Sequence, residues 1–354
     1  MQTIKRVNLE NFGKIFNKSI GTTINNFSNN TIKKIESLAY SAELPYDDGI
    51  FGPEAIEGKY FGGNQGYLTQ NCADFLKNRK VWEIVQKYYP EADSEDLELL
   101  FYRMNSVGCG YIAVINTLLF EAGIFKNKYD FDSVFGFPYF GSNGYGYDYL
   151  FLDFFLYIAK EQLDFQTIEE VYGNTAEQMK YYESEDLALT EEEFQITGMK
   201  GLLIRTAGHF FKEYLLSKGI KIDGGIIMSQ KLDNGMIIGT KLEDAIEMVS
   251  NNLSLQMIVG AKDFTLYYPY DKDGNGVLDD IAQEDVGAHA MTVVGKTDDP
   301  NKVIVSSWGR EYLIDINDID EYYVLDYSNE NGYKSEYEYI DEPYWIIDHS
   351  TWFI

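Results

Sequence analysis

One apolar segment limits what this chain can fold into more than any other feature. Residues 105–123 read NSVGCGYIAVINTLLFEAG, and from position 109 they are apolar almost all round a helix. A helix that is apolar on every face is buried, because it has no side that water would solvate. The length of the run and the glycine at position 123 predict a helix over residues 109–122.

The elements on either side of this segment predict an α+β fold. A short helix, DLELLFYRM, precedes it, and an amphipathic helix is expected over residues 203–218, where Gly219 ends it. Thr240 and Glu243 have the spacing of a capping box and predict another helix start. Strands are expected over residues 255–260, 264–270, 288–295, 302–308 and 312–316. A mainly helical half followed by a strand-rich half is typical of α+β proteins.

Composition also suggests how the chain divides. Its 354 residues are 45% hydrophobic, which is enough for a large core in one or two domains. Residues 1–92 are mixed and partly loop-like, and we expect them to form an N-terminal region that acts as a propeptide or a cap. Residues 93–354 are expected to form the main domain, with an insertion around residues 124–200.

The charge of the chain argues against several partners. A formal net charge of −28 disfavours nucleic acid and anionic membrane surfaces, because the chain would repel phosphates. The most apolar run, YLFLDFFLYIAK, is too short to span a bilayer and contains Asp153. The first residues are basic but lack the apolar region of a secretory signal. We therefore expect a cytoplasmic protein, or a secreted one if a leader has been removed.

Two cysteines, Cys72 and Cys109, are too few for a disulfide framework. Cys109 falls in the first turn of the expected buried helix, where free N–H groups and the helix dipole favour a thiolate and can donate to an oxyanion. Gly108 and Gly110 would leave room for a substrate. The alternative is a buried cysteine that acts as a small hydrophobic residue. Cys72 lacks flanking glycines and is expected to be structural.

A thiolate nucleophile needs a base within hydrogen-bond reach, usually a histidine. His209 lies on an amphipathic helix among aromatic residues, which favours packing or exposure, and His349 has no motif around it. His289 opens an expected strand between small residues, and the following strand ends in Ser-Trp-Gly. His289 is therefore the candidate base.

These motifs, taken in order, resemble those of a known family. A Cys-Gly at the start of a buried helix, a later His-Ala-x-x-x-x-Gly and a strand ending in Ser-Trp-Gly resemble the papain-like cysteine peptidases, including their bacterial branch. The resemblance implies a papain-like fold, in which the helix carrying Cys109 packs against an antiparallel strand-rich half carrying His289. It also implies that His289 takes the Cys109 proton and that Trp308 shields the histidine, although Trp308 could equally be ordinary core.

Two positions depart from the family pattern. Ser306 stands where the family has an asparagine that orients the histidine; a serine oxygen can accept the imidazole N–H, and Asp298 is an alternative. The family also has a glutamine shortly before the nucleophile, and Arg103 stands in that place here. By this resemblance, the oxyanion would be held by the Cys109 N–H and by the nearest side-chain amide, Asn105, with Arg103 as the alternative donor.

An acidic loop, DKDGNGVLDDIAQED, matches the first half of an EF-hand calcium loop. The candidate ligands are the side chains of Asp271, Asp273, Asn275 and Asp279 and the carbonyl oxygen of Val277. The twelfth position is Ala282 instead of a bidentate glutamate, so Glu284 or Asp280 would have to substitute. A calcium ion here would be structural and would stiffen the loop that precedes His289. The alternative is a solvated turn between two strands.

Together these features predict a thiol-dependent hydrolase, most specifically a cysteine peptidase acting on a peptide or protein substrate. An acyl transferase or an amidase could use the same Cys–His pair. An inactive papain-like protein that binds peptides or a partner is a further alternative, suggested by the serine and by the missing glutamine. If the N-terminal region is a cap, the full chain is latent.

Overall fold

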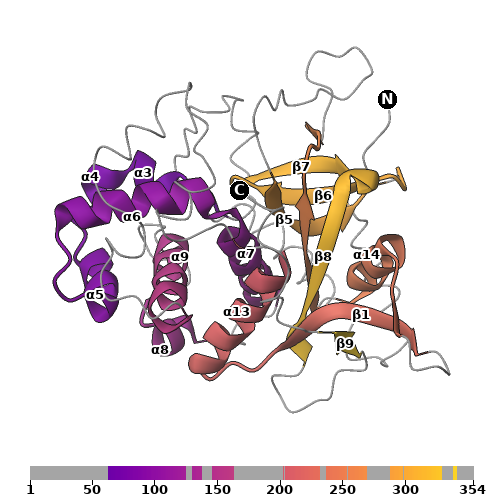
Figure 1. Cartoon of the computed structure of the whole chain (residues 1–354), viewed down its shortest axis with the longest axis horizontal. Helices are drawn as coiled ribbons and strands as arrows, with labels where there is room; N and C mark the ends of the chain where they lie inside the picture. Colours follow the sequence, from indigo (N-terminus) through magenta and orange to yellow (C-terminus); the bar gives the residue numbers. More distant parts are fainter. Residues whose placement is uncertain are drawn as a thin grey trace, which may run out of the picture.

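The computed structural model describes residues 63–124, 130–137, 146–162, 202, 204–231, 237–252, 254–268, 288–297, 299–328 and 338–340. Helices from the first half of the chain gather on one side, and an antiparallel sheet from the second half lies on the other (Figure 1). The α+β class predicted from the sequence is therefore confirmed.

Most predicted helices begin and end close to the positions that the sequence signals indicated. The described helices are α3 Tyr67–Gln70, α4 Cys72–Phe75, α5 Arg79–Tyr88, α6 Ser94–Val107, α7 Cys109–Ile124, α8 Phe131–Phe135, α9 Gly146–Tyr157, which continues as the π-helix Ile158–Gln162, α13 Ile204–Ser217 and α14 Leu242–Asn251. A capping box between Asp93 and Asp96 starts α6. The backbone after α13 turns at Gly219 with φ +82°, as expected. The predicted Thr240 cap is wrong, because Lys241 is the N-cap of α14 and makes no side-chain capping bond.

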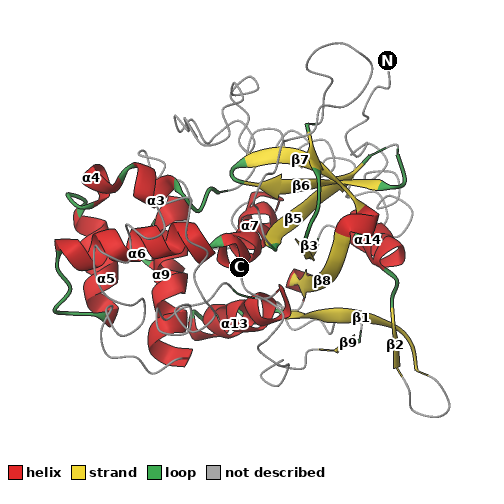
Figure 2. Ribbon diagram, turned by 45° about the horizontal axis from the view of Figure 1, so that its top comes forward, coloured by secondary structure: helices red, strands yellow, loops and turns green. Residues whose placement is uncertain are grey.

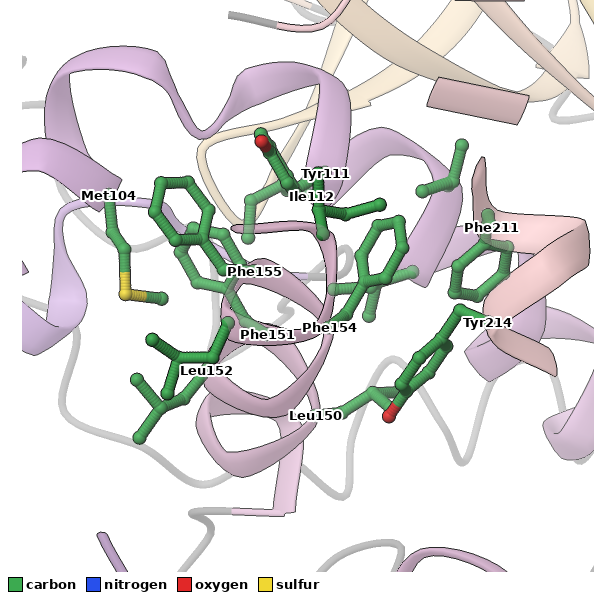
Figure 3. Packing of buried hydrophobic residues seen from close by; sticks show 14 of the residues in the cluster. Met104, Tyr111, Ile112, Leu150, Phe151, Leu152, Phe154, Phe155, Phe211 and Tyr214 are labelled. Atoms are coloured by element: carbon green, nitrogen blue, oxygen red, sulfur yellow. The ribbon is translucent and has the colours of Figure 1, made fainter. Parts of the chain in front are cut away.

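Aromatic side chains hold the helical half together. Tyr111 of α7 packs against Phe155 of α9 with ring centroids 4.5 Å apart, and Phe154 of α9 packs 5.0 Å from Tyr214 of α13 (Figure 3). Each such ring buries a large apolar area. Helix α9 lies within residues 124–200, so part of the expected insertion belongs to the core.

The described residues before position 92 also enter this core. Leu68, Phe75 and Val81 are buried in the same cluster as the residues of α7. Phe75 packs edge-on against Phe101 of α6 with ring centroids 6.1 Å apart. One continuous core thus runs across the domain boundary expected at residue 92, and residues 1–62 lie outside the described part of the chain.

A buried carboxylate ties three helices of this core together. Asp153 of α9 accepts hydrogen bonds on Oδ1 from the Tyr88 hydroxyl (2.8 Å) and Lys87 Nζ (3.2 Å). On Oδ2 it accepts from the Tyr214 hydroxyl and from Lys218 Nζ, both at 2.7 Å. Burial alone would raise the pKa of Asp153, but the charges and hydrogen bonds of these partners outweigh it and lower the pKa below its usual value. No helix in the described part of the chain is long and apolar enough to cross a membrane.

The second half of the chain forms an antiparallel sheet. Its strands are β1 Asp223–Lys231, β2 Ile237–Gly239, β3 Leu255–Ala261, β4 Leu266–Tyr267, β5 His289–Lys296, β6 Lys302–Ser307, β7 Arg310–Asp315, β8 Ile319–Asp326 and β9 Tyr339–Ile340. The order across the sheet is β2-β1-β8-β3-β5-β6-β7-β4, and β9 pairs with β1. All five predicted strand regions contain a strand, whereas β1, β2, β8 and β9 were not predicted.

The two faces of strand β5 meet different layers. Ala290 belongs to the core cluster of α7, whereas Met291 and Val293 belong to the cluster that includes α14 residues. Thr292 Oγ1 donates to the Ala113 carbonyl of α7 at 2.8 Å, so even-numbered residues of β5 face α7. Figure 2 shows α7 and α14 on opposite sides of the sheet.

Polar side chains fix α7 against this face. Asn116 Nδ2 donates to Ser306 Oγ of β6 at 3.3 Å, and Thr117 Oγ1 bonds the Tyr327 hydroxyl just past β8 at 2.7 Å. Together with the Thr292 bond, these contacts join α7 to three parts of the sheet. We refer to the three bonds as the α7 tethers.

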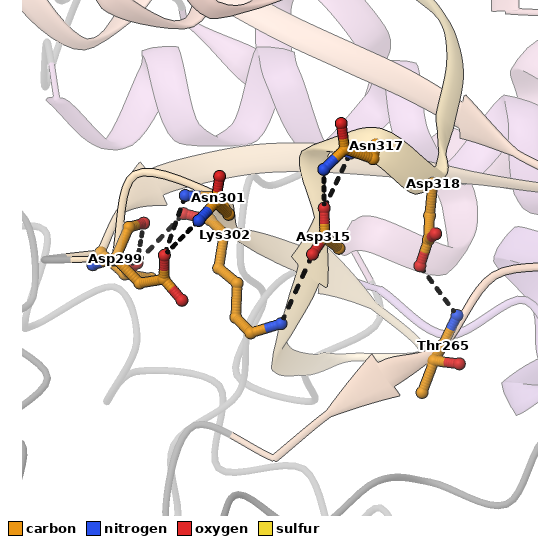
Figure 4. Close-up of polar contacts among 8 residues, drawn as sticks. Thr265, Asp299, Asn301, Lys302, Asp315, Asn317 and Asp318 are labelled. Carbon is orange, nitrogen blue, oxygen red and sulfur yellow. Dashed lines mark hydrogen bonds and ion pairs between the residues drawn. The ribbon is translucent and has the colours of Figure 1, made fainter.

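Acidic residues before β6, at the end of β7 and between β7 and β8 bind the protein's own donors (Figure 4). Asp299 accepts from the Asn301 backbone N–H at 3.0 Å, and Asp315 accepts from that of Asn317 at 2.9 Å. Asp318 accepts from the Thr265 N–H at 3.4 Å. These carboxylates therefore fix turns, and the described residues contain no group of three or more His, Cys, Asp or Glu that could hold a metal ion.

Candidate active site

Cys109 is the first residue of α7, as predicted, and only Gly108 separates this helix from α6. The Gly108 carbonyl accepts the first hydrogen bond of α7, from the Ile112 N–H at 2.9 Å. Asn105 therefore lies in the last turn of α6, and not in a loop. The Cys109 side chain is 2% exposed.

The Cys109 thiol lies against backbone donors of two elements. The N–H groups of Cys109 and Gly110 act on it from its own helix, and the N–H of Ala290 acts on it from β5. Burial has the largest effect and raises the pKa of Cys109, and the three N–H groups lower it only in part. The expected thiolate-favouring helix start is present, but burial outweighs it, so Cys109 is a neutral thiol in this arrangement.

His289 opens β5, and its ring lies between two aromatic side chains. Trp308 stacks on it at a centroid distance of 4.4 Å with an interplanar angle of 15°, and Phe264 lies beyond the ring at 6.2 Å and 11°. Burial lowers the pKa of His289 to about 3, so the imidazole is neutral at pH 7.

The hydrogen bond of the imidazole goes to Ser307, one residue beyond the predicted Ser306. His289 Nε2 and Ser307 Oγ are 2.7 Å apart. Ser306 instead faces α7, where it accepts the hydrogen bond from Asn116. Successive residues of a strand point to opposite faces of the sheet, so Ser306 and Ser307 cannot both bind the same ring. Ser307 takes the position expected of Ser306.

The structure brings the candidate nucleophile and base to neighbouring positions without bonding them. The Cys109 thiol lies beside the Ala290 N–H, and Ala290 directly follows His289. Phe264 belongs to the core on the α14 side and Trp308 packs against it, so the His289 ring is on the face away from α7. Within the described residues, no hydrogen bond joins the thiol to the ring, and the catalytic pairing stays a prediction.

Trp308 occupies a backbone conformation that is unusual for its type. Its φ is +47° and that of Gly309 is +74°, which makes a two-residue turn between β6 and β7. Such turns favour Asn-Gly, because a Cβ atom crowds the left-handed region. The strain is held at a residue that covers the candidate base, and strained backbone of this kind often occurs at functional sites.

A glutamine that the sequence did not single out lies beside Gly108, the residue before Cys109. Gln65 Nε2 donates to the Asn105 carbonyl, and Gln65 Cβ lies 3.1 Å from where a Cβ of Gly108 would be. Asn105 is half-buried at the end of α6, and Arg103 is buried on the same helix. Gln65 was missed because it lies far upstream and no local pattern connects it to the helix.

The glycines around Cys109 accommodate the protein itself. A Cβ on Gly108 would lie 2.6 Å from the ring of Phe151, and one on Gly110 would lie 2.6 Å from the Leu202 carbonyl oxygen. We expected these glycines to leave room for a substrate. In the structure the space beside each of them is occupied by neighbouring chain.

The remaining candidates have ordinary surroundings or lie outside the described residues. Cys72 is half-buried in α4, where burial first and then Glu98 raise its pKa, in keeping with a structural role. His209 Nε2 is 3.3 Å from Glu213 one turn along α13. The predicted calcium ligands lie outside the described residues; they are Asp271, Asp273, Asn275, Val277 and Asp279. The same holds for Asp280, Ala282, Glu284, Asp298 and His349.

No protein-family model, curated protein or solved structure matches this chain. The resemblance to papain-like peptidases therefore depends on the sequence motifs alone.

Proposed function

We propose that the protein is a thiol-dependent hydrolase of papain-like fold, a cysteine peptidase in which Cys109 is the nucleophile and His289 the base. The observation that supports it is the contact between the Cys109 thiol and the N–H of Ala290, the residue after His289. A helix start that carries Cys109 and a strand start that carries His289, far apart in sequence, thus lie side by side, and a thiol nucleophile and a histidine base are what thiol chemistry requires.

In this reaction the neutral pair is the resting state. When the thiol and the imidazole approach each other, Nδ1, the ring nitrogen that Ser307 does not bond, takes the thiol proton, and the thiolate attacks an acyl carbon. The N–H of Cys109 and a side-chain amide stabilise the oxyanion. Asn105 is one candidate amide for this role, and Gln65, whose Cβ lies beside Gly108 and whose amide donates to the Asn105 carbonyl, is the other. His289 then returns the proton to the leaving amine, and water hydrolyses the thioester.

A second candidate is a papain-like protein that binds peptides without cleaving them. The neutral thiol, the neutral imidazole and the absence of a hydrogen bond between these two described residues favour it. An acyl transferase or amidase would use the same residues, and would differ only in what accepts or carries the acyl group.

The proposal is tested with a peptidyl epoxide and a mixed peptide pool at neutral pH. We expect the epoxide to label Cys109 faster than Cys72, and His289→Ala to lower hydrolysis by roughly 10²- to 10⁴-fold. Ser307→Ala should lower the rate more than Ser306→Ala, because only Ser307 bonds the ring.

Equal hydrolysis in His289→Ala and the unmodified protein would contradict the proposed dyad. Saturable peptide binding without turnover, unchanged by His289→Ala, would support the binding protein instead.

A further inference from the structure

We propose that Asp148, in the first turn of α9, is the anchor for a ligand that carries an ammonium or guanidinium group. The inference begins from a difference between the two buried aspartates of this helix, Asp148 and Asp153. It does not depend on the proposed hydrolase, because neither Cys109 nor His289 enters the argument.

The two aspartates are both buried but differ in their hydrogen bonds. Asp153 accepts four, from two tyrosines and two lysines on α5 and at the end of α13. Asp148 is 1% exposed, and among the described residues no other residue donates a hydrogen bond to either of its carboxylate oxygens. Only its own main-chain N–H acts on it. Buried polar groups are normally paired, so the unpaired carboxylate of Asp148 needs an explanation other than folding.

A second unpaired polar group lies next to the first. The hydroxyl of Tyr147 is buried, and it too lacks a hydrogen-bond partner among the residues that the structure describes. Burial first, and then the charge of Asp148, raise the pKa of Tyr147, so the two groups are close enough to interact. The Tyr147 ring packs against Gly63, where any larger residue would collide with it. The ring is therefore held in place with its hydroxyl unbonded.

These two groups define the chemistry that would satisfy them. A carboxylate accepts hydrogen bonds and is stabilised most by a positively charged donor, and a phenol oxygen beside it can accept another bond. Ammonium and guanidinium groups supply both the charge and several N–H donors. One carboxylate and one phenol are by themselves too few for calcium or magnesium, which take at least about six oxygen ligands. An amine or a guanidine is therefore the ligand class that fits.

The site lies on the face of α9 that meets the start of α7. Phe151 follows Asp148 by three residues and so shares its face of the helix, and the Phe151 ring lies 2.6 Å from where a Cβ of Gly108 would be. The carboxylate oxygens are enclosed, so a ligand enters by opening the first turn of α9, whose N–H groups have no partners within the helix. Burial raises the pKa of Asp148 well above its usual value, so the closed site holds a proton that the charge of the ligand replaces.

The test measures binding to the full chain by isothermal titration calorimetry. The probes are butylammonium and butylguanidinium, with 1-butanol as their neutral counterpart. We expect saturable binding of at least one cation but not of 1-butanol, and tighter binding as the pH rises, because Asp148 must lose its proton. Asp148→Asn keeps the side-chain shape and removes the charge, so it should weaken binding at least about tenfold. Asp132→Asn, which removes an exposed carboxylate from the first turn of α8, is the matched control and should change binding less than about twofold.

Melting temperatures without ligand give a second measurement. Asp148→Asn should not lower the melting temperature, because it breaks no hydrogen bond to another residue. Asp153→Asn loses the counter-charge of a buried ion pair and should lower the melting temperature by at least about 6 °C.

Three results would each overturn the inference: no saturable binding of either cation, equal binding by Asp148→Asn, or a melting temperature of Asp148→Asn as low as that of Asp153→Asn. Failure of Asp148→Asn to fold has the same meaning, since it would make Asp148 structural. Peptide hydrolysis is tested through Cys109 and His289, so either proposal can fail without the other.

Discussion

Replacing Asp153 with asparagine removes the charge at the centre of the helical core while keeping the side-chain shape. The carboxylate is 4% exposed and takes four hydrogen bonds, two of them from lysines. Lys218 is 14% exposed, so the variant leaves a nearly buried ammonium without its counter-charge. Removing one partner of a buried ion pair costs about 3–5 kcal/mol of unfolding free energy. We expect a loss in that range for Asp153→Asn.

The two lysines provide an internal comparison. Lys87 is 52% exposed at the same carboxylate, so Lys87→Met should cost less than about 1 kcal/mol. Lys218→Met should cost clearly more, because Lys218 is nearly buried and lies 2.7 Å from the carboxylate. Urea unfolding at pH 7, followed by tryptophan fluorescence and circular dichroism, measures all three values.

The pH dependence of the unfolding free energy tests the contribution of Asp153 independently. The folded pKa of Asp153 is lowered, so its contribution is complete above the unfolded pKa of about 3.9 and is lost as the pH falls through the lower folded value. Asp153→Asn should therefore show a shallower loss of stability below about pH 4. An Asp153→Asn protein within about 0.5 kcal/mol of the unmodified one, or equal effects of the two lysine variants, would refute this reasoning.

Two further predictions concern the candidate base and the acidic loop. Trp308→Asn should relieve turn strain of roughly 1 kcal/mol, because asparagine tolerates positive φ. The same change should uncover the His289 ring, so an NMR titration should show the pKa of His289 rising from about 3 toward 6.5. The unmodified protein should lose stability as the pH falls from about 6.5 toward 3, because only the unfolded state takes up a proton on His289, and the variant should lose less. An unchanged pKa of His289 in the variant would contradict the shielding role of Trp308. If residues 271–279 bind calcium, a chelator should lower the melting temperature, and Asp273→Ala should abolish that change without altering Cys109 labelling. Identical melting curves in chelator and in millimolar calcium would indicate an ordinary turn.

Local patterns in the sequence predicted the elements that carry the candidate site. The start of α7, the start of β5 and the end of β6 are marked by an apolar run, by glycines and by short motifs, all within a few residues of Cys109, His289 and Trp308. Strand β1 escaped prediction because DGGIIMSQK opens with glycines, which are poor strand formers. Strand β8 escaped because IDEYYVLD carries acidic residues at its ends.

Contacts between distant parts of the chain were beyond such patterns. Gln65 and Leu202 reach the start of α7 only through tertiary packing, and nothing near them in the sequence signals it. The sequence predicted Ser306 as the hydrogen-bond partner of His289, whereas the structure has Ser307, and this difference has another cause. It depends on the face of the sheet on which the imidazole lies, and a Ser-Ser-Trp-Gly motif offers a hydroxyl to both faces.

The α7 tethers have a consequence for how stiff the site is. Thr292, Asn116 and Thr117 hold α7 to the sheet at three places. The main chain around Cys109 is therefore rigid and preorganised, and it does not have to change conformation during a reaction. Motion during a reaction is then confined to side chains. Amides in the middle of α7 should exchange with deuterium only on global unfolding.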